Sequence, residues 1–291
     1  MDEVQVVYKA RELVKKAKPT SVPVPVEIYA REVGAIIKAD EMEPDEAGCC
    51  FEAGGKRFIC TNANDTPQRQ RFTVCHEVAH LWLRLPSQHG GSAWSYAKRP
   101  RAEIFCDIFA AELLLPYDLF CPEAEKAQIS LSSIDALAER FDASSIATAS
   151  RFAYVVTAPV AFVLSENGKV RHASRAKALR EAQAWIAPGL ELPQGSLTSR
   201  VRDGKTGQTR EEVDADLWFS DWERGGTLLE EARHLQKWDQ TLTLLWFDDE
   251  ELPARKTRDE RGSIIDEKES EDNTLLKELD GQLRWPSKNR R

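Results

Sequence analysis

The feature that most constrains the fold is the sequence His-Glu-Val-Ala-His at positions 76–80, inside a run of residues that favours a helix. The run starts at Thr66, a good helix cap followed by a proline at the first helical position, and Pro86 ends it. Residues four apart lie about 40° apart around a helix, so His76 and His80 share one face and can bind one metal ion. We therefore expect a long helix here, with both imidazoles as metal ligands.

Glu77 is the candidate general base of such a site. It lies at the edge of the face that carries the two histidines, near the metal but outside the ring of ligands. From there it can take a proton from zinc-bound water, as hydrolases with an H-E-x-x-H motif require. The alternative is a pair of helix-face histidines without a metal, and the helical setting of the motif argues against it.

A catalytic zinc ion needs a third protein ligand, which must come from another part of the chain. His89 lies beyond the break in the helix and fits no ligand spacing. Glu103 lies at the start of the next strong helix, and Asp107 follows on the same face, where it can hydrogen-bond a ligand imidazole. Considered alone, Glu103 is equally well explained as a solvated acid in a first helical turn. The residues by themselves leave the third ligand open.

Two segments resemble the hallmarks of the ImmA/IrrE family of metallopeptidases. Residues 71–80 resemble its R-F-T-x-x-H-E-x-x-H helix, and residues 103–116 resemble its E-x-x-A-N-x-F-A-A-x-L-L-M-P helix. The resemblance covers about residues 1–155. The second segment departs from the family pattern at Cys106 for Ala, Asp107 for Asn and Leu115 for Met. We interpret the cysteine and the leucine as packing changes, whereas the aspartate can still accept a hydrogen bond.

The resemblance implies that Glu103 is the third zinc ligand, because it is the first residue of the second hallmark. The predicted site then has His76, His80 and Glu103 on the metal, Glu77 as the catalytic base, and Asp107 hydrogen-bonded to a ligand imidazole. Zinc is the expected metal, although such a ligand set also accepts manganese or iron. Family members cleave or inactivate helix-turn-helix repressors in stress responses and mobile elements. The expected partner is therefore a protein substrate, a DNA-binding repressor.

The expected fold class is α+β, with a mainly helical, zincin-like metallopeptidase domain around a small sheet, followed by a small α+β domain. Asn167-Gly168, between two apolar runs, is the best short hairpin signal in that second part. Family relatives carry a GAF-like sensory domain at this position, so a GAF-like or PAS-like sensor is expected by position alone. The predicted segments are 1–125, metallopeptidase; 126–157, helix-turn-helix-like; 158–253, α+β and sensory; and 254–291, a charged, disordered tail.

Charge and cysteine content exclude several classes of protein. A formal net charge of -8 argues against a general binder of nucleic acid or of membrane surfaces, which needs concentrated positive charge. The acidic start of the chain does not resemble a secretory signal, and no apolar run approaches the roughly 18 residues that span a bilayer. The six cysteines form no C-x-x-C pair, so reduced thiols in a cytoplasm are expected. The sequence indicates no oligomeric state.

Three functional hypotheses follow. The first is a zinc-dependent endopeptidase that cleaves a transcriptional repressor. The second is a non-catalytic metal-binding regulator that acts by binding a repressor. The third is a DNA-binding transcription factor, because residues 137–145 resemble a helix-turn-helix. Its second helix offers only Arg151 as a base, however, and phosphate contacts need several, so direct nucleic-acid binding is the least favoured. Tyr96 is one of several loop residues that could stabilise an oxyanion.

Overall fold

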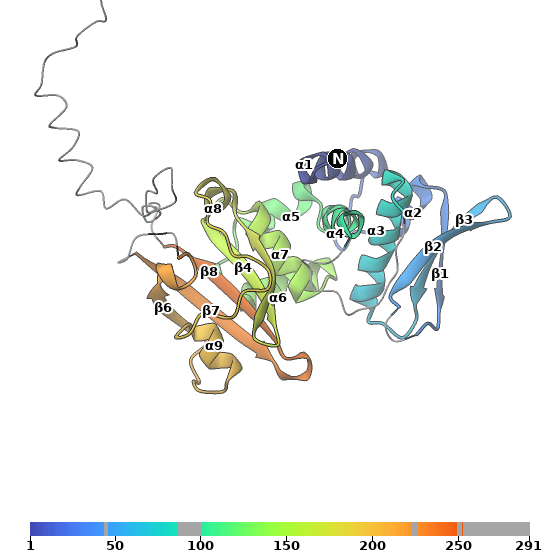
Figure 1. Cartoon of the computed structure of the whole chain (residues 1–291). Helices are drawn as coiled ribbons and strands as arrows, with labels where there is room; N and C mark the ends of the chain where they lie inside the picture. The colour runs from blue at the N-terminus through green and yellow to red at the C-terminus, as the bar shows by residue number, and fades with distance from the viewer. Residues whose placement is uncertain (44–45, 87–99, 221, 223–225, 249–251, 253–291) are drawn as a thin grey trace, which may run out of the picture.

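The computed structural model describes residues 1–43, 46–86, 100–220, 222, 226–248 and 252. The expected α+β class is confirmed, with a helical layer between two separate sheets (Figure 1). His89, Tyr96 and the tail 254–291 lie outside the described residues. Among the residues that are described, no helix is long and apolar enough to cross a membrane.

The elements up to residue 155 form a small sheet and a mainly helical layer, as the sequence predicts, although helix α5, which follows Pro116 directly, was not expected. They are α1 (Glu3–Ala17), α2 (Glu27–Glu32), β1 (Ala35–Asp40), β2 (Gly48–Ala53), β3 (Lys56–Asn62), α3 (Pro67–Leu83), α4 (Arg101–Leu114), α5 (Tyr117–Ala124), α6 (Leu131–Phe141) and α7 (Ser145–Val155).

The remaining elements build a second, antiparallel sheet. They are β4 (Val160–Glu166), β5 (Lys169–Arg175), α8 (Lys177–Glu181), α9 (Leu197–Arg202), β6 (Arg210–Asp214), β7 (Thr227–Leu235) and β8 (Gln240–Trp246). The hairpin expected at Asn167-Gly168 joins β4 to β5, and both residues have positive φ. Helix α8 is short, and Ile186, which follows it, is buried in the apolar core beside this sheet.

Helix α3 begins and ends where its sequence predicts. The Thr66 hydroxyl accepts a hydrogen bond from the backbone N–H of Arg69, and Pro67 occupies the first helical position. At the other end Arg84 adopts a left-handed conformation, with φ of 55°, and its N–H bonds to the His80 carbonyl. The helix therefore spans the whole H-E-x-x-H segment without a break.

The small sheet, in the order β1-β3-β2, packs one face against α3. Strand β1 runs parallel to β3, and β2 runs antiparallel to it at the edge of the sheet. The contact between β2 and α3 requires glycine at position 48, because a Cβ there would collide with the Cys60 carbonyl and the Thr73 methyl group. This close approach brings β2 beside the middle of α3.

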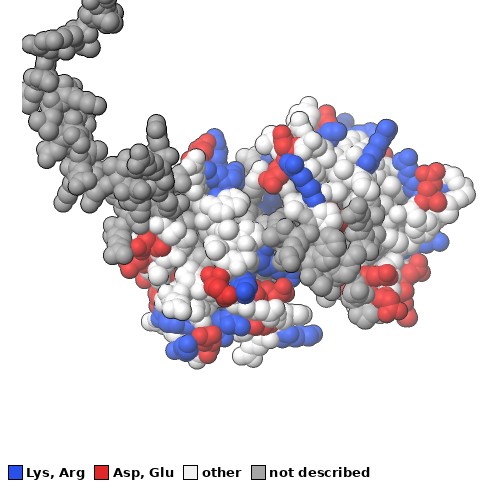
Figure 2. Space-filling model, viewed as in Figure 1, with Lys and Arg blue, Asp and Glu red and all other residues white. Residues whose placement is uncertain are grey.

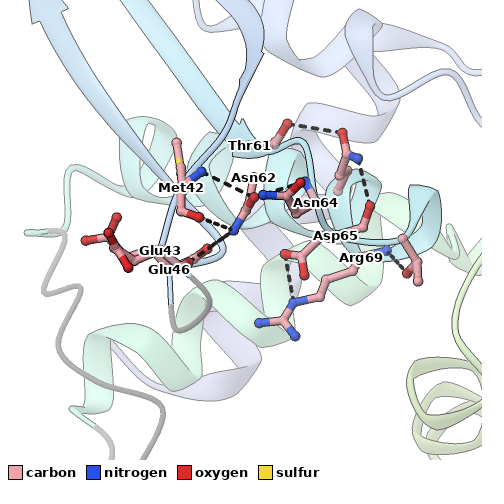
Figure 3. Close-up of polar contacts among 10 residues, drawn as sticks. Met42, Glu43, Glu46, Thr61, Asn62, Asn64, Asp65 and Arg69 are labelled. Atoms are coloured by element: carbon pink, nitrogen blue, oxygen red, sulfur yellow. Dashed lines mark hydrogen bonds and ion pairs between the residues drawn. The ribbon is translucent and has the colours of Figure 1, made fainter.

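A buried asparagine fixes the connection between this sheet and α3 (Figure 3). The Asn62 side-chain amide donates to the backbone carbonyls of Met42, Glu43 and Glu46, at 2.8 to 3.4 Å. Its carbonyl oxygen accepts from the N–H groups of Met42 and Asn64. The Asn62 side chain therefore connects the loop after β1 to the turn that leads into α3. Asn62 can be buried because its polar side-chain atoms all have hydrogen-bond partners.

The larger sheet has the order β5-β4-β8-β7-β6, with every neighbouring pair antiparallel. Successive residues of a strand point to opposite faces, and both faces of its central strands are apolar. Phe162 of β4 and Leu244 of β8 belong to the same buried cluster as residues of the helical layer, such as Phe152 of α7. Ala161 and Val163 of β4 face a second apolar cluster on the other side. The helical layer and the inner face of this sheet thus share one core.

The helix-turn-helix-like segment forms as α6 and α7, joined by a turn at Asp142, which has φ of 50°. Its single basic candidate for DNA contact, Arg151, is buried. Its guanidinium lies 2.7 Å from the Glu112 carboxylate of α4 and donates through Nε to the Leu115 carbonyl at 3.1 Å. Arg151 therefore attaches α7 to α4 and cannot contact a phosphate on the surface.

We expect Arg151→Met to lower the free energy of unfolding by about 3 kcal/mol, because it leaves the buried Glu112 carboxylate without its nearest cation. The matched control is Arg140→Met, which removes a guanidinium from an exposed pair with Glu123. The control should leave the urea midpoint unchanged within error. Equal shifts in the two variants would contradict the structural role assigned to Arg151.

Candidate metal centre

The two histidines of α3 lie one helical turn apart and are both buried, at 8% and 3% exposure. Their Nε2 atoms are 3.1 Å apart, and their rings meet edge to face. The structure therefore brings His76 and His80 together on one helix face, as the spacing of the sequence predicts.

Glu103 lies in the first turn of α4 and points toward the same two imidazoles. Its Oε2 is 3.1 Å from Nε2 of His76, and its Oε1 is 3.5 Å from Nε2 of His80. The residue is only 5% exposed, so it is not a solvated first-turn acid. Because α3 and α4 pack side by side, a residue 23 positions beyond His80 reaches the histidine pair.

These three side chains fit a divalent transition metal. Metal–ligand bonds of about 2.0 to 2.1 Å, directed to the corners of a tetrahedron, place neighbouring ligand atoms about 3.3 Å apart. The three separations between the ligand groups are 3.1, 3.1 and 3.5 Å. Two imidazoles with one carboxylate are also a donor set that catalytic zinc uses.

Each imidazole has a hydrogen-bond partner that leaves Nε2 facing the centre. Nδ1 of His76 lies 2.9 Å from Oδ1 of Asp107, and Nδ1 of His80 lies 3.3 Å from the Leu85 carbonyl. If both Nδ1 atoms carry the proton, both Nε2 lone pairs are available to a metal. Burial lowers the pKa of His76, but hydrogen bonds to Asp107 and Glu103 outweigh it and raise the pKa to about 9.

Glu77 is buried on α3 directly after His76, at 1% exposure. Strand β2 supplies a neighbour for it that the sequence did not suggest. Burial raises the pKa of the Cys50 thiol, and the charge of Glu77 and a hydrogen bond to its carboxylate raise it further. The Cys50 thiol thus lies close to the Glu77 carboxylate. No local pattern reveals this contact, because it depends on the position of β2 against α3.

A second residue that the sequence did not assign to the site is Cys106. One ligand atom each from His76, His80 and Cys106 lie within 4.8 Å of one another, and all three residues are buried. Cys106 stands three residues after Glu103, on the same face of α4. That spacing is a signal that could have identified it. Burial raises the pKa of its thiol, and the carboxylates of Glu103, Asp107 and Glu77 raise it further.

Comparison with known proteins finds one family model that is similar to part of the chain. Residues 35–153 match the family model described as the IrrE N-terminal-like domain, a peptidase family, which agrees with the resemblance seen in the sequence. The matched range contains all the residues of the candidate centre. No curated protein matches the chain.

A solved structure shares the wider fold. It is a Mycobacterium tuberculosis transcriptional regulator, with a TM-score of 0.54 and 15% sequence identity. The match covers 83% of this chain and 76% of that one, so it extends beyond the family domain into the five-stranded sheet. At this identity the similarity concerns the fold and not the activity.

We expect Asp107→Ala to weaken metal binding about 10- to 100-fold, because it removes the hydrogen bond that orients His76. Asp107→Asn, which restores the residue usual in the family pattern, keeps an oxygen acceptor and should bind metal nearly as tightly as the wild type. Competition with a chromogenic chelator measures both affinities. An equal loss of metal affinity in the two variants would show that the acceptor oxygen at position 107 does not support metal binding.

Proposed function

We propose that this chain is a zinc-dependent endopeptidase. His76, His80 and Glu103 hold the metal, and Glu77 is the general base. The observation that carries the proposal is the set of three ligand-to-ligand separations, 3.1, 3.1 and 3.5 Å, next to a buried glutamate. The match of residues 35–153 to a peptidase family supports it. Manganese or iron are the alternative metals for this donor set.

In the proposed reaction, a bound zinc ion would supply Lewis acidity to the scissile carbonyl and make water more acidic. The Glu77 carboxylate takes a proton from the attacking water and returns it to the nitrogen of the leaving amine. The Cys50 thiol lies beside the Glu77 carboxylate. Asp107 and the Leu85 carbonyl hold the two imidazoles in the orientation that ligation requires.

The proposed substrate is a DNA-binding transcriptional repressor, cleaved in a cytoplasmic stress or mobile-element response. Support comes from the family match and from the structural relative, which is itself a transcriptional regulator. Direct DNA binding by this chain is disfavoured because Arg151 is buried. The described part of the face drawn in Figure 2 also carries interspersed basic and acidic side chains, not one broad basic area.

The proposed division of the chain remains 1–125, 126–157, 158–253 and 254–291. A sensory, GAF-like or PAS-like role for the third segment is supported by its single antiparallel sheet of five strands, which has an apolar cluster of its own on the outer side. The alternative function is a non-catalytic, metal-binding regulator that acts by binding a repressor. The regulator named as the structural relative favours it.

Elemental analysis and a cleavage assay on the full chain test the proposal together. We expect about one zinc ion per chain in the wild type and in Glu77→Gln, and little in Glu103→Ala. Repressors encoded beside the gene are the substrates to offer, and Glu77→Gln should not cleave them. A Glu77→Gln variant that still acts on its repressor would favour the binding regulator. A wild type that takes up no metal would exclude both functions.

A further inference from the structure

One face of α4 carries more donor groups than a three-ligand site needs. Glu103, Cys106 and Asp107 follow one another at helical spacing and all approach the histidines of α3. Glu103 is already paired with the two Nε2 atoms, and Asp107 with Nδ1 of His76. Cys106 is fully buried, and its sulfur lies within 4.8 Å of one ring nitrogen of each histidine.

The sulfur is close enough to coordinate the same ion. Zinc–sulfur bonds are about 2.3 Å and zinc–nitrogen bonds about 2.0 Å, which separates the two ligand atoms by about 3.5 Å in a tetrahedron. The upper limit of 4.8 Å on the sulfur-to-nitrogen distances leaves a gap of about 1 Å, within the reach of a small side-chain movement. The two imidazoles and Glu103 take three corners, so the sulfur would take the fourth.

We propose that Cys106 is a fourth metal ligand that competes with water, so that the centre has a closed state beside its open, catalytic state. Structural zinc sites are closed by four protein ligands, whereas catalytic sites keep one position for water. On closing, the water leaves, the thiol proton passes to solvent, and a sulfur–metal bond forms. The proposal rests on the ligand set proposed above and adds a way of holding the peptidase inactive.

X-ray absorption on the zinc-loaded full chain tests this directly. We expect one sulfur at about 2.3 Å in the wild type and only nitrogen and oxygen neighbours at about 2.0 to 2.2 Å in Cys106→Ser. Cobalt substitution gives a second readout, because a thiolate ligand adds a charge-transfer absorption in the near ultraviolet. The matched control is Cys50→Ser, which removes the other thiol beside Glu77 and should keep the sulfur signal.

The outcomes separate the two proposals. A wild type with one zinc and no sulfur neighbour would overturn the role of Cys106 and leave the three-ligand peptidase intact. A wild type that binds no metal would overturn both. A sulfur signal that persists in Glu103→Ala, with metal retained, would support Cys106 and refute Glu103 as a required ligand. If Cys106→Ser does not fold, the wild-type spectrum and the Cys50→Ser spectrum decide the question.

A kinetic readout follows from the competition with water. With saturating zinc, Cys106→Ala should cleave substrate with a higher kcat than the wild type, because the fourth position is then always open to water. Metal binding by the same variant should be weaker, since one ligand is lost. A lower kcat with unchanged metal affinity would overturn the competition and indicate that Cys106 only packs.

Discussion

The packing of α3 against α4 is the constraint on which the rest of the centre depends. One helix supplies His76, Glu77 and His80, and the other supplies Glu103, Cys106 and Asp107. The separations of 3.1 and 3.5 Å between Glu103 and the imidazoles require these helices to keep a fixed distance and rotation. The surrounding elements hold α3 and α4 in this arrangement. Strand β2 lies against α3 through Gly48, α1 packs on α4, and the Arg151–Glu112 pair holds α7 to the far end of α4.

The electrostatics of the centre point to a cation. Glu77 and Glu103 are buried, Asp107 lies beside them, and burying several carboxylates together is unfavourable unless positive charge is near. Without a metal, a proton on His76 partly balances them, which is why the pKa of this histidine stands near 9. A divalent ion at the same place supplies more positive charge and interacts with both imidazoles at once. The proton on His76 thus supplies part of the positive charge that a bound metal would supply.

The sequence best predicted the features that depend on neighbouring residues in the chain, such as the ends of α3 and the spacing of its histidines. The cap at Thr66 and the left-handed end at Arg84 set α3, and the four-residue spacing set the shared histidine face. Glu103 stayed ambiguous on residues alone, because only the packing of two helices turns a first-turn acid toward the histidines. The Cys50–Glu77 contact depends on where β2 lies against α3, which no local pattern reveals. Cys106 was interpreted as packing, although its spacing from Glu103 pointed to the centre.

The shared core has a consequence for the evolution of this architecture. Phe162, Leu164, Leu244 and Trp246 belong to the sheet in sequence, yet they lie in one cluster with residues of helices α3 and α4, which carry the proposed metal ligands. A gene fusion or exchange that joined a different sheet after residue 157 would have to match this apolar surface side chain by side chain. A chain shortened at that point would expose to water the helical residues that share this cluster, such as Phe152. The helical part and the sheet are therefore expected to have been inherited together.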